Sequence, residues 1–115
     1  MECNDETRRT VRIRELNDRL RQTLCVGGRV VVTAGIAALP PEAVADILKA
    51  VATFDKFTPD NDPCEEHDCA VLDAAGERIM WKVDYYDLAM EFLSPDPSNP
   101  AVTRRVLTVM LASEY

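Results

Sequence analysis

The sequence predicts a small α+β domain, with an antiparallel or mixed sheet of about four strands and about three helices packed mainly on one face. Three observations lead to this class. The chain of 115 residues has 47% hydrophobic content, which suits one compact core and is too little for two. Apolar residues recur with a helical period in some segments and alternate in others. Glycine and proline residues separate these segments.

A helix is predicted over residues 8–24, after a flexible tail at residues 1–7. Its apolar residues fall close to one helical stripe, and charged residues occupy most other positions, as a helix with one buried side requires. The stripe contains Ile13, Leu16, Leu20 and Leu24. The pair Gly27–Gly28 is expected to end this helix.

The next two predicted elements are a strand over residues 29–37 and a helix that begins at Pro41. The strand segment, "RVVVTAGIA", is apolar and β-branched on both faces, which indicates a strand covered on both sides. Pro41 suits the first turn of a helix. The buried stripe of this helix is expected to contain Val44, Ile47, Leu48, Val51 and Phe54.

A long loop at residues 55–67 leads into a predicted hairpin. The loop has two prolines and no apolar period, and loops of this length are usually functional or disordered. Strands over residues 68–73 and 77–86 follow, with Gly76 able to take the left-handed turn conformation. Because side chains alternate along a strand, Trp81 is predicted to be buried.

The same alternation predicts which side chains of the second hairpin strand point to the same face of the sheet. Trp81 and Tyr85 share one face, and Asp84 and Tyr86 share the other.

Two further elements complete the predicted fold. Residues 88–93 are read as another strand. Asn99 and Pro100 provide a cap and a first turn for a last helix. The apolar stripe of that helix would contain Val102, Val106, Val109 and Met110.

The charge of the chain is strongly uneven. The formal net charge is −7, yet residues 1–29 hold seven arginines and five acids. Residues 55–96 hold twelve acids against three basic residues. An anionic surface of this kind repels nucleic acid and attracts basic proteins.

The same composition predicts where the protein works. The N-terminal residues are charged and no apolar run reaches the roughly 20 residues of a membrane span. We therefore expect a soluble, cytoplasmic protein. The four cysteines, at irregular spacing, are then expected to be reduced thiols.

The segment "DNDPCEEHD", residues 60–68, concentrates five acids and the only histidine of the chain. It begins like a calcium loop, but Glu65 stands where glycine is needed and Val71 where a bidentate acid is needed. Cys64, His67 and Cys69 offer three zinc ligands without a clear fourth. We therefore predict no metal and no cofactor.

Catalysis and nucleic-acid binding are the other uses that these residues suggest. His67 could act as an acid or base oriented by neighbouring acids, which would make a hydrolase-like or metal-assisted enzyme. No nucleophile elbow, phosphate-binding glycine loop or zinc-protease motif accompanies it. The arginines of residues 8–24 are interleaved with acids, and the domain as a whole is anionic, which argues against direct nucleic-acid binding.

Several motifs resemble an uncharacterised bacterial family that is catalogued as a domain of unknown function. The resemblance extends from about Ile13 to Tyr115. The motifs are "IRELNDRLRQT", "NDPCEEHD", "WKVDYYD" and "SPDPSNPAVTRRVLTVMLASEY". The family's loop pattern is N-D-P-aromatic-G-E-H-D-F-G. This chain departs from that pattern at Cys64, Glu65, Cys69 and Ala70.

The resemblance implies a compact bacterial domain that is often associated with mobile elements. Small acidic proteins from that setting are frequently inhibitors of host defence, including anti-CRISPR proteins. The family has no established chemistry that transfers to this chain.

We therefore expect a small acidic interaction protein rather than an enzyme. It would inhibit a bacterial nucleic-acid-handling complex, such as a CRISPR effector, by placing an anionic surface against a basic protein surface. The enzyme that uses His67 is the first alternative, and a structural subunit of a larger assembly is the second. The expected contact residues are Asp60, Asp62, Glu65, Glu66, Asp68, Asp84, Tyr86 and Asp87.

Overall fold

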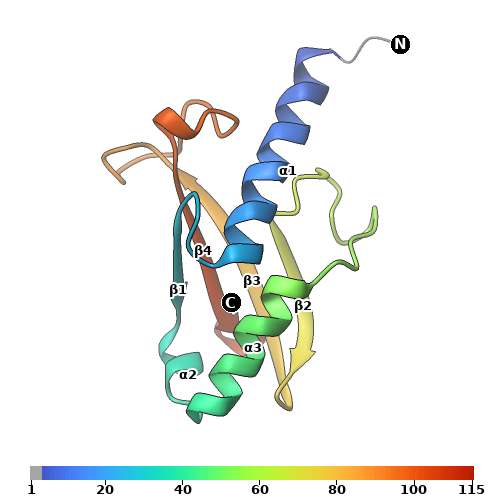
Figure 1. The fold of residues 1–115 in the computed structure, drawn as a ribbon, viewed down its shortest axis with the longest axis vertical. Coiled ribbons are helices and arrows are strands. Elements are labelled where there is room, and N and C mark those ends of the chain that lie inside the picture. The colour runs from blue at the N-terminus through green and yellow to red at the C-terminus, as the bar shows by residue number, and fades with distance from the viewer. Residues whose placement is uncertain (1–3) are drawn as a thin grey trace.

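The computed structural model describes residues 4–115, and its first element is a long helix that crosses a sheet (Figure 1). Along the chain the helices are α1 (Asp5–Thr23), α2 (Ala34–Ala37) and α3 (Pro41–Thr53). The strands are β1 (Arg29–Val32), β2 (Cys69–Ala74), β3 (Glu77–Tyr86) and β4 (Arg104–Leu111). Two short 3-10 helices, η1 (Pro100–Val102) and η2 (Ala112–Glu114), flank β4.

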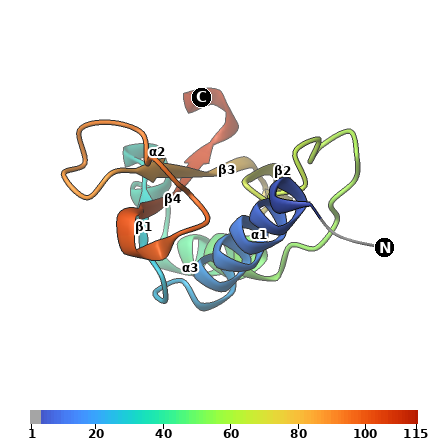
Figure 2. The same ribbon diagram turned by 90° about the horizontal axis from the view of Figure 1, so that it is seen from above.

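The four strands form one mixed sheet in the order β1-β4-β3-β2. β1 runs parallel to β4, whereas β4 with β3 and β3 with β2 pair antiparallel. Seen from above, α1 and α3 cover the same face of this sheet (Figure 2). The predicted α+β class, with a small mixed sheet and helices mainly on one face, is confirmed.

The core lies between that face of the sheet and the two long helices. Trp81 of β3 is fully buried, which confirms its predicted orientation. Leu107 and Val109 of β4 lie in the same cluster, together with Leu20 of α1 and Ile47 of α3. Among the described residues, no helix is long and apolar enough to cross a membrane.

α1 begins three residues earlier than predicted, because Asn4 caps it. The side chain of Asn4 accepts a hydrogen bond from the Thr7 amide at 2.7 Å. Asp5 and Glu6 then place negative charge in the first turn, where the helix dipole favours it. Of the predicted tail at residues 1–7, residues 1–3 lie outside the described part of the chain.

The strand predicted over residues 29–37 is shorter than expected, since only residues 29–32 pair with β4. The chain then turns into α2. Glu114 stabilises this turn, because its carboxylate accepts hydrogen bonds from the Thr33 hydroxyl at 2.6 Å and the Gly35 amide at 3.1 Å. Ile36, which was predicted to lie on the strand, is instead the buried residue of α2.

The C-terminal helix prediction is wrong: the segment forms the central strand β4. Asn99 and Pro100 do start a helical turn, but η1 ends at Val102. The following residues alternate between buried and more exposed positions. Their β-branched side chains favour a strand. This strand, β4, pairs with both β1 and β3 in the sheet.

The strand predicted over residues 88–93 is also absent, and the segment is a turn with one bridge between Leu93 and Tyr86. Asp87 explains the turn, because its carboxylate accepts hydrogen bonds from the amides of Glu91 at 3.0 Å and Phe92 at 3.4 Å. The hairpin is confirmed, and Gly76 takes the predicted left-handed conformation, with φ of 77°.

Candidate functional site

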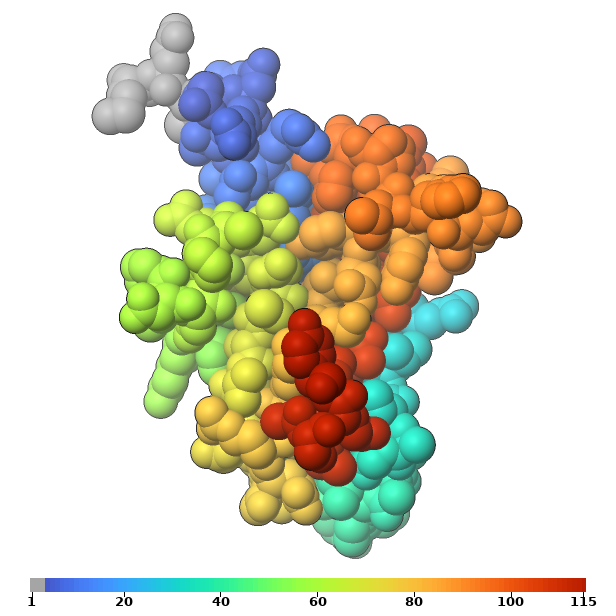
Figure 3. Space-filling model, turned by 180° about the vertical axis from the view of Figure 1, so that it is seen from behind, coloured from blue at the N-terminus to red at the C-terminus, as the bar shows by residue number. Residues whose placement is uncertain are grey.

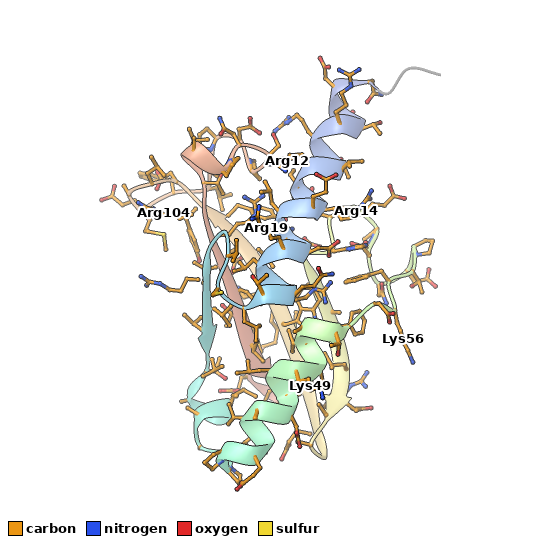
Figure 4. All side chains as sticks on the ribbon, in the orientation of Figure 1. Arg12, Arg14, Arg19, Lys49, Lys56 and Arg104 are labelled. Atoms are coloured by element: carbon orange, nitrogen blue, oxygen red, sulfur yellow. The ribbon has the colours of Figure 1, made fainter. Side chains whose placement is uncertain are left out.

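Residues 60–68, which we call the acidic loop, lie against α1 in the connection between α3 and β2 (Figure 1). Two side chains of α1 hold its backbone. Arg14 donates to the carbonyl of Glu65 at 3.0 Å, and Asn17 donates to the carbonyl of Glu66 at 3.0 Å. Figure 4 shows Arg14 on the side of α1 that faces this loop. The loop is therefore ordered by contacts to a helix that precedes it by about fifty residues.

His67 connects the acidic loop to α1 and to the core. Its Nδ1 lies 2.8 Å from a carboxylate oxygen of Asp18, and its Nε2 lies 3.5 Å from a carboxylate oxygen of Asp62. The imidazole stacks on the Phe57 ring, with centroids 3.7 Å apart and planes 5° from parallel. Both ring nitrogens thus face carboxylates, and one ring face is covered.

A buried arginine extends this arrangement into the core. Arg21, which is 2% exposed, donates to Asp18 at 3.0 Å. It also donates to the carbonyls of Val51 at 3.0 Å and Phe54 at 2.7 Å, which are free at the end of α3. The result is a connected row of side chains in the order Arg21, Asp18, His67 and Asp62.

A second polar network lies under Glu66. The Tyr85 hydroxyl donates to the Glu66 carboxylate at 2.9 Å and accepts from the Asn17 amide at 2.7 Å. Burial raises the pKa of Tyr85, and the negative charge of Glu66 raises it further. Tyr85 therefore stays protonated and remains a donor. Arg105 completes the network by donating to the Asn17 side chain at 2.9 Å.

The backbone of the acidic loop is strained at two positions. Glu65 has φ of 59° and His67 has φ of 52°, both in the left-handed region that side chains with a Cβ avoid. Each such residue costs on the order of 1–3 kcal/mol and persists where its surroundings hold it. The surroundings here are the contacts of Arg14, Asn17 and Asp18 just described.

The acids predicted for the contact surface divide into exposed and engaged groups. Asp60 and Glu65 are exposed. Asp62 is only 5% exposed and accepts from the His67 amide at 3.1 Å, so its expected role as a surface contact is wrong in this conformation. Glu66 is half-buried on Tyr85.

Asp68 is half-buried at the start of β2. Burial raises the pKa of Asp68, and the charges of Asp62 and Asp84 raise it further. A carboxylate in such a position is held at some cost to the fold.

Of the predicted contacts on β3, Asp84 lies beside Asp68 at the end of the acidic loop, because the Val83 amide donates to the carbonyl of Asp68 at 2.7 Å. Asp84 pairs with Lys82 at 2.9 Å, and it shares with Tyr86 the sheet face opposite Trp81. Asp87 is half-buried and holds the turn that follows β3. The structure therefore does not join all eight predicted residues into one exposed patch.

A shallow hollow of about 420 Å³ opens beside His67. It is lined by Arg14, Phe57, Thr58, Pro59, Asp62, Glu65 and His67. Within residues 4–115, no three histidine, cysteine or acidic side chains gather closely enough to hold a metal ion. Cys25, Cys64 and Cys69 are free thiols, and Cys3 lies outside the described residues.

Sequence reasoning missed the helix residues that organise this site. The charged residues Asp18 and Arg21 were expected on a solvated face of the first helix, and Asn17 was not singled out, yet Asn17 and Arg21 are buried. One signal was present: both residues follow the apolar positions Leu16 and Leu20 directly, on the same side of the helix. A polar residue next to a buried stripe is a candidate for an internal hydrogen bond.

The family comparison agrees with the motifs. Residues 32–114 match the family described as a protein of unknown function, DUF3768. The chain belongs to this family. The match begins after α1 and covers the acidic loop and the whole β2-β3-β4 unit. Comparisons with curated proteins and with solved structures gave no match.

Proposed function

We propose that this DUF3768 protein is a binding protein that presents the acidic loop to a basic surface of a partner. One observation carries the proposal. Arg14 and Asn17 hold the loop by its carbonyl groups, so they leave the Glu65 carboxylate exposed. Among the described residues, neither Asp60 nor Glu65 forms an ion pair.

The order of the loop favours tight binding by charge. A flexible acidic segment loses conformational freedom when it docks, whereas a loop already fixed on α1 loses less. The left-handed conformations of Glu65 and His67 are accompanied by contacts to α1 within the protein. Exposed carboxylates in fixed positions can also displace a phosphate backbone from a basic channel.

The partner we propose is a bacterial nucleic-acid-handling complex, with a CRISPR effector subunit as the specific form. Such complexes carry basic channels that bind phosphates, and an anionic protein would compete for them. Twelve acids against three basic residues at positions 55–96 supply the long-range attraction. The protein would act in the bacterial cytoplasm as an inhibitor, as small acidic proteins of mobile elements do.

The test begins with capture of a partner from a bacterial host lysate at low salt. The affinity of the captured partner is then measured at two salt concentrations. The decisive variant reverses two exposed loop charges, Asp60→Lys with Glu65→Lys. A matched control, Glu42→Lys with Asp46→Lys, makes the same change of net charge on the exposed side of α3.

We expect the loop variant to lower the affinity for the partner by about tenfold or more for each reversed carboxylate that contacts an arginine of the partner. The α3 control should lower the affinity by less. Salt should weaken the wild-type complex steeply and the loop variant less. The captured partner should also release its DNA when the wild-type protein is added. Equal binding by the two double variants would contradict the proposal.

An enzyme that uses His67 is the second candidate, favoured by the hollow beside the imidazole. Against it, both ring nitrogens already face Asp18 and Asp62, so neither points at a substrate. His67→Ala separates the two functions. For a binding protein it loosens the acidic loop and weakens binding modestly, whereas for an enzyme it abolishes activity while binding persists.

A further inference from the structure

A second hollow, of about 620 Å³, lies on the other side of α1 from the acidic loop. Its walls are the loop between α1 and β1 and the first residues of β4. Six of its lining residues are Gly27, Gly28, Arg29, Thr103, Arg104 and Arg105. Three of these are arginines, and no acid lines the space. We call it the arginine hollow.

The two segments that carry these charges lie far from the acidic loop. In Figure 4, Arg104 lies on the opposite side of the molecule from Lys56, which precedes the acidic loop. Seen from behind, the yellow-green acidic loop and the orange segment after β3 form separate lobes at opposite edges of the molecule (Figure 3). The arginine hollow is therefore a separate site from the one proposed above.

Arg105 is a buried cation without an anionic partner. It is 2% exposed, and it donates to the Asn17 side chain and to the carbonyl of Pro97. No carboxylate of residues 4–115 lies within ion-pair distance of it. Arg21, the other buried arginine, forms an ion pair with Asp18. The Arg105 guanidinium also lies over the Tyr85 ring, 5.1 Å from its centroid, while the carbonyl oxygen and Cβ of Arg105 face Gly28. Arg105 therefore contributes its backbone, and not a free guanidinium, to the wall of the hollow.

Arg29 and Arg104 stand at the rim of the hollow. Both are exposed, and neither forms an ion pair with a described residue. They come from the neighbouring strands β1 and β4, where Arg29 pairs in register with Val106. Their guanidinium groups are free to bind two oxygens each, in the geometry that suits a phosphate.

The glycine pair sets the position of the wall. A Cβ at Gly28 would lie 2.6 Å from the carbonyl oxygen of Arg105, so only glycine lets the loop approach β4 this closely. Gly27 has φ of 91°, which glycine tolerates without strain. The loop is thus placed against the strand that carries Arg104 and Arg105.

We propose that the arginine hollow binds a small phosphate-bearing molecule. The two exposed guanidinium groups of Arg29 and Arg104, with no acid among the lining residues, favour an anion of more than one charge. The volume is in the range of small-ligand sites. A long polyanion fits less well, because the chain as a whole has a net charge of −7 and would repel the strand beyond the hollow.

The experiment is isothermal titration calorimetry of the full chain with pyrophosphate as the main probe. Inorganic phosphate, adenosine triphosphate and a single-stranded DNA decamer serve as comparison ligands. Arg29→Ala and Arg104→Ala remove the two exposed arginines, which have no packing role in the core. Arg19→Ala is the matched control, because Arg19 is equally exposed but lies on α1.

We expect Arg29→Ala and Arg104→Ala each to weaken pyrophosphate binding by about tenfold or more, and Arg19→Ala to leave it unchanged. Tighter binding of adenosine triphosphate, with the same dependence on the two arginines, supports a nucleotide as the ligand. Absence of pyrophosphate binding, or equal loss in all three variants, overturns the proposal. Tighter binding of the decamer than of pyrophosphate overturns the assignment to a small molecule.

Discussion

The acidic loop and the arginine hollow lie on two sides of α1, and each is built over a buried arginine. Under the acidic loop, Arg21 meets Asp18 and the free carbonyls of α3. Beside the hollow, Arg105 donates to the side chain of Asn17 and the carbonyl of Pro97, and its guanidinium lies over the Tyr85 ring. Among the described residues, the first arginine has a carboxylate at ion-pair distance and the second does not.

This difference shows how one small fold keeps opposite charges apart. Asn17 touches both regions, because its amide donates to Glu66 and its oxygen accepts from Arg105. It separates the carboxylates from the unpaired guanidinium by neutral hydrogen bonds. The acids can then face outward on one side of α1 while positive charge collects on the other.

The largest expected effect concerns Trp81, which supports the acidic loop from below. Phe57 lies between Trp81 and His67, at 6.1 Å from the indole centroid and 3.7 Å from the imidazole centroid. Trp81→Ala should lower the free energy of unfolding by about 3–5 kcal/mol, because it leaves a cavity in the core. Urea denaturation measures this loss, and a variant as stable as wild type would contradict the packing described here.

The two buried arginines give a direct test of the comparison. Arg21→Met should destabilise the fold by about 2–4 kcal/mol, since it leaves Asp18 and the carbonyls of α3 without their donor. Arg105→Met should cost less, about 1–2 kcal/mol, because it also removes an unpaired buried charge. Denaturation of both variants in one buffer decides the order. A larger loss for Arg105→Met would mean that its charge is neutralised in a way not seen here.

A smaller effect is expected at Glu65, where the loop pattern of the resembling family has glycine. Glu65→Gly should raise the free energy of unfolding by up to about 1 kcal/mol, because relief of left-handed strain exceeds the added chain entropy. Asp60→Gly is the control, since it removes the same charge at a position without positive φ. The strain interpretation fails if the two variants have the same stability.

The smallest effect concerns the pH dependence of stability through Asp68. Its pKa is raised in the fold by burial, so ionisation favours the unfolded chain. The destabilisation is absent at a pH below the ordinary aspartate value of 3.8 and grows as pH rises through the raised folded value. Asp68→Asn should therefore melt above wild type at pH 7, with a smaller difference at pH 4. Melting curves at the two pH values check both sign and trend.

The hairpin could be predicted because its alternation is regular and Gly76 marks its turn. The strand β4 could not be predicted from the sequence, and the position of Arg105 is one physical reason. A charged residue on the buried face interrupts the alternation of Thr103, Leu107 and Val109. The spacing of Val102, Val106 and Val109 then imitates a helix, behind a genuine helical start at Asn99.

The position of the acidic loop in the sequence could be predicted, but the contacts that hold it in the fold could not. The acidic loop stands out by composition alone. Its orientation depends on Asn17, Asp18 and Arg21 of α1, about fifty residues or fewer away, and no local pattern connects them to it. The arginine hollow has no sequence signature, because β1 and β4 meet only in the sheet.

The most direct test of this separation of charge is a pair of NMR titrations of the isotopically labelled protein, followed by the backbone amide shifts. Pyrophosphate is added in one and an arginine-rich nonapeptide in the other. The account predicts that pyrophosphate shifts the amides of residues 27–29 and 103–106, whereas the peptide shifts those of residues 60–66. Shifts in the same set of amides for both ligands would contradict it.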